Sequence, residues 1–244
     1  MMELYGMSSP NVVKITIMLH EAGLPYEMHH ISVFEGDQFR PAFKALNPNS
    51  KVPVLVDHSS VGGGSHTVFE SGAILLYLAE KTGVGLSSDP LARSRQIQWL
   101  MVQLTGIGPM CGQLTHFSRY APAGNEYSLA RYRSEVRRLL QVLDDRLKEH
   151  EYLADGYSIA DMATAPWIRL LSTMYPWLQA NEEGPALREY PSLRRWLEVV
   201  IARPAVIAGI EAGERFLPND MEKFKKADAD QFDRFFGRGK YLLA

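Results

Sequence analysis

The sequence has 244 residues, of which 46% are hydrophobic and 22% are charged, a composition typical of a folded protein of one large domain or two ordinary ones. The net charge of −2 disfavours a dedicated nucleic-acid-binding protein, which is normally basic. The single cysteine, Cys111, excludes an internal disulfide framework and a cysteine-based zinc site. No signal-peptide pattern and no long apolar run is visible, so we expect a cytoplasmic protein without a membrane span or metal site.

The first segments in chain order alternate between strand and helix patterns. Residues 3–6 are strand-like, and residues 10–22 keep apolar side chains at helical spacing until Gly23 ends the pattern. Residues 26–33 are a second strand candidate and residues 52–56 a third. This alternation predicts a small α/β unit.

A hairpin and a helix are expected next. Residues 58–66 are rich in turn formers, and Gly62, Gly63 and Gly64 suit a link into a strand over residues 67–69. Residues 71–81, "SGAILLYLAEK", are strongly apolar at helical spacing and are followed by Gly83. We therefore place the end of the α/β domain at residue 83.

Helical patterns dominate the rest of the chain. Apolar residues recur at helical spacing over 136–147, and Ser158 followed by Asp161 is a capping-box pattern at the start of a helix over 159–173. "SLRRWLEVVIARP" predicts another helix, ended by Pro204. These patterns predict an all-helical domain over residues 91–218. The charged, phenylalanine-containing extension over 219–244 is expected to pack as a helix, with partial disorder as the alternative.

The turn "SSPNVVKI" carries the first chemical signal. Ser9 occupies an N-cap position and Pro10 the first helical position, where a redox protein would place a C-x-x-C motif. One interpretation is a plain helix cap; the other is a turn that stabilises a thiolate brought by a ligand. Lowering a thiol pKa by two units requires about 2.7 kcal/mol. A helix N-terminus supplies about 0.3–1 kcal/mol and a hydrogen bond to a charged acceptor about 1.5–3 kcal/mol, so a donor from Ser9 or Asn11 is sufficient together with the helix.

Two further stretches are compatible with a peptide ligand. In "NPNSKVPVL", a cis bond between Val52 and Pro53 would turn the backbone groups of Val52 outward for pairing with an extended peptide. In "FESGAILLYLAEK", the helix N-terminus at Ser71 suits a carboxylate and Glu70 suits an ammonium group. The alternative is that Ser71 is a plain N-cap beside a carboxylate favoured by the helix dipole.

Several stretches together resemble the cytosolic glutathione transferases, and within them the nu-class group of bacterial disulfide-bond oxidoreductases. They include "PNVVKITIMLHEAGLPYE", "GDQFRPAFKALNPNSKVPVLVDH", "FESGAILLYLAEKTG", "GIGPMCGQLTHF", "ARYRSEVRRLLQVLDDRL" and "YSIADMATAPW". The resemblance implies α/β plus all-α architecture, with a thioredoxin-like N-terminal domain and an all-helical C-terminal domain. It also implies a homodimer that uses glutathione, reduced or oxidised, as co-substrate.

The resemblance further implies roles for particular residues. Ser9 and Asn11 match the residues that face the glutathione sulfur, although the family usually has Thr at the first position. Gln38 matches a residue near the glycine end, and the backbone of Val52, with Lys51 beside it, pairs with the cysteinyl part.

The other end of the ligand has matches as well. Glu70 and Ser71 match the γ-glutamyl site, and Arg131 matches an arginine that reaches a second glutathione or the disulfide form. From the local sequence alone, Arg131 belongs to a solvated basic helix face.

Other candidates are expected to be structural. Tyr5 lies too early to be the catalytic tyrosine of other transferase classes, and Cys111 is expected to be a buried apolar residue. Four residues are candidates for lining the second-substrate pocket, with part of them expected in the core: Met110, His116, Phe117 and Trp167.

The expected activity is disulfide-bond reduction with small-molecule thiol and disulfide substrates, accompanied by weak conjugating or peroxidase activity. One alternative is a detoxifying transferase that conjugates or cleaves an aromatic or halogenated electrophile. The other is a non-catalytic glutathione-binding regulatory protein.

Overall fold

The computed structural model describes residues 1–60, 63–180 and 186–241. Its internal contacts divide the chain into two compact units. Met1–Leu78 and Ala208–Ala244 form one, which we call the N-terminal unit, and Ala79–Ile207 form the other, the helical unit. The structure thus groups residues 208–218 with the first segment of the chain, whereas domain boundaries at residues 83, 91 and 218 stay a prediction.

A four-stranded mixed sheet with the order β2-β1-β3-β4 lies at the centre of the N-terminal unit. β1 and β2 are parallel, whereas the β1–β3 and β3–β4 pairs are antiparallel. Leu4 of β1 is fully buried and faces Met28 on one side and Leu55 on the other. The strands are Met2–Gly6 (β1), Tyr26–His30 (β2), Val54–Asp57 (β3) and His66–Phe69 (β4).

The sheet agrees with the expected thioredoxin-like pattern, with two differences at strand ends. β2 ends at His30 instead of residue 33, and β3 begins at Val54 instead of residue 52. Pro53, which has no N–H to donate to a ladder, precedes β3, and the Val52–Pro53 peptide bond is cis. The hairpin between β3 and β4 forms as expected, although Gly62 lies outside the described residues.

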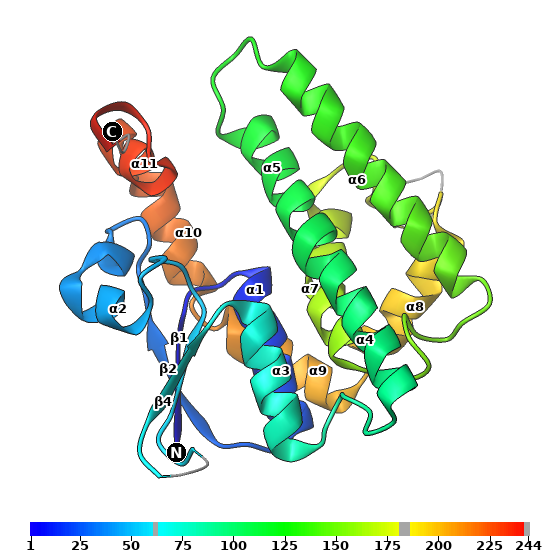
Figure 1. Cartoon of the computed structure of the whole chain (residues 1–244). Coiled ribbons are helices and arrows are strands. Elements are labelled where there is room, and N and C mark those ends of the chain that lie inside the picture. The colour runs from blue at the N-terminus through cyan, green and yellow to red at the C-terminus, as the bar shows by residue number, and fades with distance from the viewer. Residues whose placement is uncertain (61–62, 181–185, 242–244) are drawn as a thin grey trace. The chain divides into compact units, whose positions relative to one another are not determined.

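Helices cover both faces of this sheet (Figure 1). α1 (Pro10–Glu21) and the first turns of α3 (Ser71–Thr82) lie on one face, and α2 (Pro41–Leu46) lies on the other. α2 and the preceding 3₁₀ turn, Asp37–Phe39, were not expected from the sequence. α2 has only six residues, too few for a helical period to show.

The C-terminal segment returns to the N-terminal unit. It contains the end of α9 (Pro204–Glu214), α10 (Leu217–Lys226), α11 (Ala229–Phe236) and a 3₁₀ turn, Gly239–Tyr241. α9 approaches α1 so closely that a Cβ at Gly209 would lie 2.6 Å from the Cα of Ile17, which requires glycine there. The hydroxyl of Thr16 donates to the Gly209 carbonyl at 2.6 Å.

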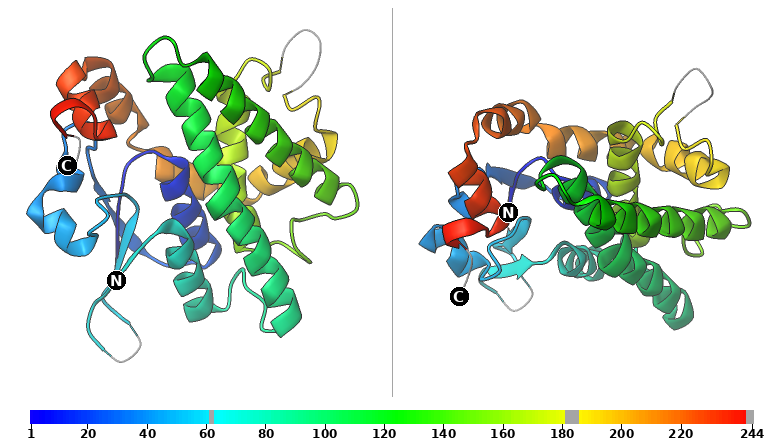
Figure 2. Two further views of the ribbon diagram at one scale, coloured as in Figure 1. Left: turned by 45° about the horizontal axis from the view of Figure 1, so that its top comes forward. Right: turned by 90° about the horizontal axis from the view of Figure 1, so that it is seen from above.

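α10 and α11 pack beside α2 and the loop that precedes it, as the views in Figure 2 agree. Phe34 lies at the centre of this contact, with ring centroids 5.6 Å from Phe224, 6.1 Å from Phe232 and 5.2 Å from Phe235. The same cluster includes Val52. The expected packing of a C-terminal helix is therefore observed, and it involves two helices.

The helical unit contains α4 to α8. Asp161 anchors it, because its buried carboxylate accepts the N–H of Leu153, the N–H of Ser158 and the indole N–H of Trp196. The expected capping box at Ser158 is present. The helices are Pro90–Val102 (α4), Gly108–Arg119 (α5), Glu126–Leu147 (α6), Ile159–Met174 (α7) and Pro191–Ile201 (α8), with a π-helical turn, Gln103–Ile107, before α5.

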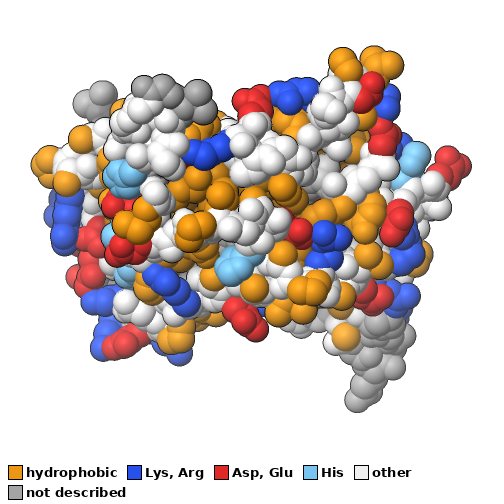
Figure 3. All heavy atoms as spheres, turned by 90° about the horizontal axis from the view of Figure 1, so that it is seen from below, with side chains coloured by type: hydrophobic (Ala, Val, Ile, Leu, Met, Phe, Trp, Pro, Cys, Tyr) orange, Lys and Arg blue, Asp and Glu red, His pale blue; other side chains and the backbone are white. Residues whose placement is uncertain are grey.

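Charged side chains of both signs are interspersed with hydrophobic ones on the face shown in Figure 3. Among the described residues, no helix is both long enough and apolar enough to cross a membrane.

Candidate active site

The first turn of α1 holds Ser9 in the N-cap position that its sequence predicts. Its backbone is extended, with φ −151° and ψ 154°, and its Oγ accepts the N–H of Val12 at 3.4 Å. The hydroxyl uses an oxygen lone pair in this contact, so its hydrogen stays available for a second bond. Ser9 and Asn11 are both half-buried at this turn. The arrangement offers a hydroxyl donor at the positive end of a 12-residue helix.

The electrostatics of this turn favour an anion. No acidic residue lies in the first turn of α1, so the positive helix end is not neutralised from within. Just before this turn, Asp220 of α10 accepts the N–H of Ser8 at 2.8 Å. Asp220 also lies 2.6 Å from His30 Nε2. Both oxygens of the Asp220 carboxylate therefore already have a partner, the Ser8 N–H and His30.

Ser71, Glu70 and Lys14 form a second polar group. α3 begins at Ser71, and the carbonyl of Glu70 accepts the N–H of Ile74 at 2.9 Å, so Ser71 is the first helical residue and not the N-cap. The Ser71 hydroxyl oxygen accepts from Lys14 Nζ at 3.3 Å. Glu70 is exposed and has a positive φ of 69°. A hydroxyl, an amine and a carboxylate thus meet at one helix N-terminus, which suits a zwitterionic head group.

Lys14 is the unexpected member of this group. It is 1% exposed and lies on the buried side of α1. Burial lowers the pKa of its amine to about 7, against a smaller raising influence from Glu70. Lys14 is therefore poised to gain or lose its charge near neutral pH.

A short loop brings Lys51 and Val52 toward Glu70. Buried Asn47 shapes it, because its amide donates to the Lys51 carbonyl at 2.7 Å and its Oδ1 accepts the N–H of Asn49 at 2.9 Å. The side chain of Asn49 donates to Glu70 Oε1 at 3.0 Å. Asn49 therefore links the loop that carries Lys51 to Glu70, two of the residues expected to bind glutathione.

Gln38 is more buried than the ligand-binding role implied by the resemblance would suggest. Its side chain is 3% exposed, and its Nε2 donates to the Val33 carbonyl at 3.1 Å. Its Oε1 is buried without a hydrogen-bond partner among the described residues. A contact between Gln38 and a ligand stays a prediction.

Arg131 belongs to the helical unit. It lies exposed on α6 and pairs with Glu135 at 3.5 Å, while Glu135 also pairs with Arg138 at 2.6 Å. Its approach to a bound ligand stays a prediction.

Tyr5 and Cys111 have structural surroundings. The Tyr5 hydroxyl donates to Glu3 at 2.6 Å, its ring stacks on His29, and burial together with that carboxylate raises its pKa to about 12. Cys111 is 1% exposed, and burial raises the pKa of its thiol to about 12. Neither group is prepared to act as an anion at neutral pH.

The residues expected to line a second-substrate pocket lie in the helical unit. Met110, His116, Phe117 and Trp167 are all half-buried. The rings of His116 and Phe117 meet edge to face at 5.2 Å, and Phe117 stacks on Tyr132. Their contact with a substrate stays a prediction.

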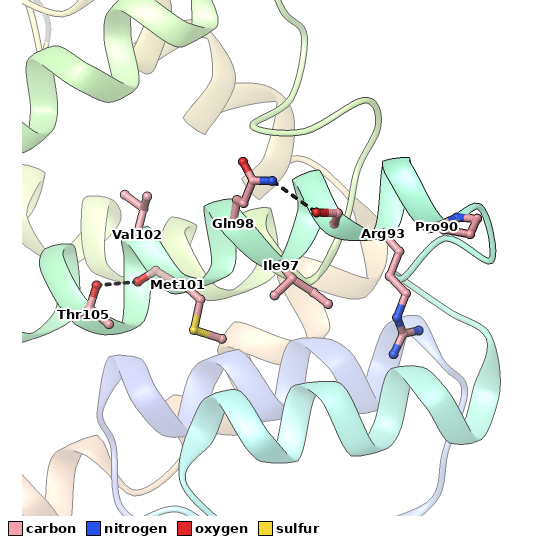
Figure 4. A pocket seen from close by; sticks show the side chains of 8 residues that line it. Pro90, Arg93, Ile97, Gln98, Met101, Val102 and Thr105 are labelled. Carbon is pink, nitrogen blue, oxygen red and sulfur yellow. Dashed lines mark hydrogen bonds between the residues drawn. The ribbon is translucent and has the colours of Figure 1, made fainter.

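A separate hollow of about 690 Å³ follows one side of α4 (Figure 4). Ile97 and Met101 line its apolar part, and Arg93 lies at one end. None of the residues singled out from the sequence lines it. The described residues contain no cluster of His, Cys, Asp and Glu that would hold a metal ion.

The sequence patterns did not indicate three positioning residues: Lys14, Asn47 and Asp220. A charged residue inside the apolar run "VVKITIML" was a usable signal for Lys14. Asn47 lies in the quoted "NPNSKVPVL" stretch, but its bonds to the loop have no sequence signature. Asp220 acts on a turn 212 residues away, which a local pattern does not reveal.

Comparison with known proteins places these features in a family. The N-terminal domain of glutathione S-transferases matches residues 8–81, and the C-terminal domain of the same family matches residues 126–198.

Individual relatives agree with this match. The Escherichia coli disulfide-bond oxidoreductase YfcG is 43% identical over 207 residues, which cover 84% of this chain and 92% of that protein. The E. coli disulfide-bond oxidoreductase YghU is 38% identical over 242 residues, covering 95% of this chain and 82% of its own. A glutathione transferase from Burkholderia graminis, crystallised with two glutathione molecules per subunit, superposes with a TM-score of 0.79 at 45% identity, covering 88% of this chain and 89% of that one. The chain belongs to the glutathione S-transferase family.

Proposed function

We propose that the chain is a glutathione-dependent disulfide-bond oxidoreductase. The observation that carries this proposal is the first turn of α1, where a helix N-terminus without acidic residues presents the Ser9 hydroxyl. The chain has one cysteine, which is buried, so the attacking sulfur is proposed to come from glutathione. The names of the E. coli relatives and the two glutathione molecules bound by the B. graminis protein support the same assignment.

The proposed reaction consists of two exchanges. The thiolate of one glutathione attacks a sulfur of the substrate disulfide, forms a mixed disulfide and releases the other half as a thiolate, which takes up a proton. A second glutathione thiolate attacks the mixed disulfide, releases the second substrate thiol and forms oxidised glutathione. Two glutathione molecules are oxidised and one substrate disulfide is reduced. Thiol–disulfide exchange is fastest for a thiol whose pKa lies near the ambient pH.

Each residue is assigned to the part of glutathione that its position suits. Ser9 and Asn11 stabilise the sulfur anion, and neither acts as a base. Ser71 and Glu70 bind the γ-glutamyl head, with Lys14 supporting the Ser71 hydroxyl from the buried side. The backbone of Val52 pairs with the cysteinyl part.

Further residues are assigned to the rest of the ligand. Gln38 is assigned to the glycine end, Lys51 to the glutathione site beside Val52, and Arg131 to the second glutathione. A homodimer, the nu class and a cytoplasmic location are part of the same proposal.

The test is the reduction of 2-hydroxyethyl disulfide by glutathione. We expect Asn11→Ala and Ser9→Ala to lower kcat/KM by at least about tenfold each, since one hydrogen bond to a charged acceptor is worth about 1.5–3 kcal/mol. Ser8→Ala is the matched control, because it removes a neighbouring hydroxyl and leaves the Ser8 N–H bonded to Asp220. Unchanged rates in both test variants contradict the proposed roles. Glutathione binding without turnover of any disulfide favours a non-catalytic binding protein.

A further inference from the structure

We propose that His30 is a positioning residue for the first turn of α1 and that it acts on this turn through Asp220. The inference rests on the proposed function, in which that turn stabilises the glutathione sulfur, and adds a residue that none of the sequence motifs contains. His30 is the last residue of β2, and Asp220 lies in α10. Both residues belong, like the turn, to the N-terminal unit.

The Asp220 carboxylate lies between His30 and the turn. Its Oδ1 is 2.6 Å from His30 Nε2, and its Oδ2 accepts the Ser8 N–H at 2.8 Å. An imidazole can present an N–H at Nε2 whether it is neutral or protonated, so His30 is able to donate to Asp220 in either state. Because His30 holds one carboxylate oxygen, the other is kept in the direction of the Ser8 N–H. The backbone just before Ser9 is thereby tied to the end of β2.

The backbone fixes His30 relative to the same turn. His30 lies opposite Gly6, the last residue of β1, and the N–H of Ile31 donates to the Gly6 carbonyl at 2.9 Å. A Cβ at Gly6 would lie 2.9 Å from two side-chain carbons of Val12, so glycine lets α1 begin close to the strand. The end of β2 and the start of α1 are therefore held against each other by the fold itself.

An aromatic ring covers the pair of side chains. The ring centroids of Phe216 and His30 are 4.6 Å apart, and the side chains of His30 and Asp220 are 19% and 7% exposed. The Arg215 guanidinium lies 4.6 Å from the centroid of Phe216 and donates to the Met28 carbonyl of β2. A polar contact is stronger where water is largely excluded. The contact between His30 and Asp220 is thus well placed to hold the carboxylate.

His30 is also the partner that can offset the charge of Asp220. In the described part of the chain no lysine or arginine forms an ion pair with this carboxylate, since Lys223 pairs with Glu35 and Arg215 donates to a backbone carbonyl. A carboxylate without a cation raises the pKa of a nearby thiol, because like charges disfavour the thiolate. Both the hydrogen bond of His30 and its positive charge, when protonated, therefore favour the thiolate.

The other titratable groups of β2 are separated from His30. Alternate residues of a strand project to opposite faces of a sheet, so Glu27 and His29 share the face opposite to that of His30. There the Nε2 of His29 lies 3.9 Å from Glu27 and 3.8 Å from Glu3 of β1. Tyr26 lies at the far end of the strand. Asp220 is therefore the charged group that His30 contacts.

The test measures the pKa of the bound glutathione thiol, from the ultraviolet absorbance of its thiolate, together with kcat/KM for 2-hydroxyethyl disulfide. We expect His30→Phe, which keeps a ring against Phe216, to raise this pKa by about 0.5–1 and to lower kcat/KM at neutral pH about three- to tenfold. His30→Gln, whose amide N–H can replace Nε2–H, should recover part of the loss. His20→Phe is the matched control and should match the parent, because His20 is exposed in the last turn of α1.

A double-mutant cycle separates an action through Asp220 from a structural role of the ring. In an Asp220→Ala background, His30→Phe should lower kcat/KM by less than about a further twofold, because the partner through which it acts is gone. S-methylglutathione has no thiol to ionise, so its Kd should stay within about twofold of the parent value in His30→Phe.

Three results overturn the inference. The first is an unchanged thiol pKa and kcat/KM in His30→Phe, and the second is an equal effect of this substitution with and without Asp220. The third is a loss of S-methylglutathione affinity as large as the loss of kcat/KM, which would indicate a general loosening of the fold. A parent chain that neither ionises bound glutathione nor turns over a disulfide contradicts the proposed function, whereas an active parent with unaffected His30 variants contradicts this inference alone.

Discussion

Asp220 and Ser8 are joined by a hydrogen bond across 212 positions of the sequence, with the Ser8 N–H donating to Asp220 Oδ2 at 2.8 Å. The other carboxylate oxygen lies 2.6 Å from His30 Nε2 at the end of β2. Asp220 is 6% exposed, so both contacts are shielded from water. A residue of the C-terminal segment thereby holds the backbone next to Ser9 and Asn11.

Replacing this carboxylate should loosen the first turn. We expect Asp220→Ala to lower the free energy of unfolding by about 1.5–3 kcal/mol, the value of a hydrogen bond to a charged group, and to raise the Kd for glutathione. Urea unfolding and calorimetry measure the two effects. Glu222→Ala, an exposed α10 residue paired with Lys226, is the control. Unchanged glutathione affinity in Asp220→Ala would show that the first turn does not need this support.

Lys14 should make stability depend on pH. Its pKa is about 7 in the folded chain and 10.5 as the ordinary value, so between these values the unfolded state binds more protons than the folded state. The free energy of unfolding therefore rises with pH across that window, by up to about 1.4 kcal/mol per pH unit. Below pH 7 Lys14 is protonated in both states, so it adds no further pH dependence. In Lys14→Met this contribution should disappear from urea unfolding measured between pH 7 and 9. Parallel pH profiles for parent and variant would contradict the account, and Lys225→Met is the exposed control.

The same amine should affect ligand binding. Protonated Lys14 supports Ser71, where the γ-glutamyl carboxylate is proposed to bind, so the affinity for the peptide should fall as the pH rises above 7. S-methylglutathione is the suitable probe, because it has no titrating thiol. Calorimetry between pH 6 and 9 should show a larger decline in the parent than in Lys14→Met, because the α-ammonium group of the probe, which is proposed to bind Glu70, titrates in both. A decline of equal size in the variant would rule out Lys14 as its source.

Asp161 should carry much of the stability of the helical unit. Its carboxylate accepts from Trp196 at 2.8 Å, from Leu153 at 3.0 Å and from the N–H and hydroxyl of Ser158 at 3.0 and 3.1 Å. The Asn amide keeps one oxygen, but its nitrogen cannot accept the two bonds made to the other, so Asp161→Asn should lower the free energy of unfolding by about 2–5 kcal/mol, since each hydrogen bond to a charged group is worth about 1.5–3 kcal/mol. Denaturant unfolding measures the loss. Asp155→Asn, which breaks an exposed ion pair with Arg95, should have a smaller effect. Equal losses of unfolding free energy in the two variants would show that Asp161 contributes no more to stability than an exposed ion pair does.

Local patterns predicted much of this fold because the relevant physics is local. The apolar spacing and glycine stop of α1, the capping box at Ser158 and the turn-rich link between β3 and β4 each depend on neighbouring residues. α2 was missed because six residues do not show a helical period and Phe43 is its one buried apolar side chain. The start of β3 was displaced because the apolar run begins before Pro53, whereas the ladder begins after it.

The site was predictable where its residues form a contiguous motif. Ser9 with Asn11, and Glu70 with Ser71, are sequence neighbours at helix starts, and the structure places each pair at a helix N-terminus. Lys14 and Asp220 depend on contacts 57 and 212 residues apart, so no short stretch reveals them.

The central claim, that the attacking sulfur belongs to glutathione, is tested most directly in a chain without any thiol. Cys111→Ala removes the single cysteine, which is 1% exposed and has a pKa raised to about 12 by burial. We predict that this variant reduces 2-hydroxyethyl disulfide with glutathione at the kcat/KM of the parent. A well-folded Cys111→Ala chain that has lost the reaction would place the sulfur in the protein and contradict the account.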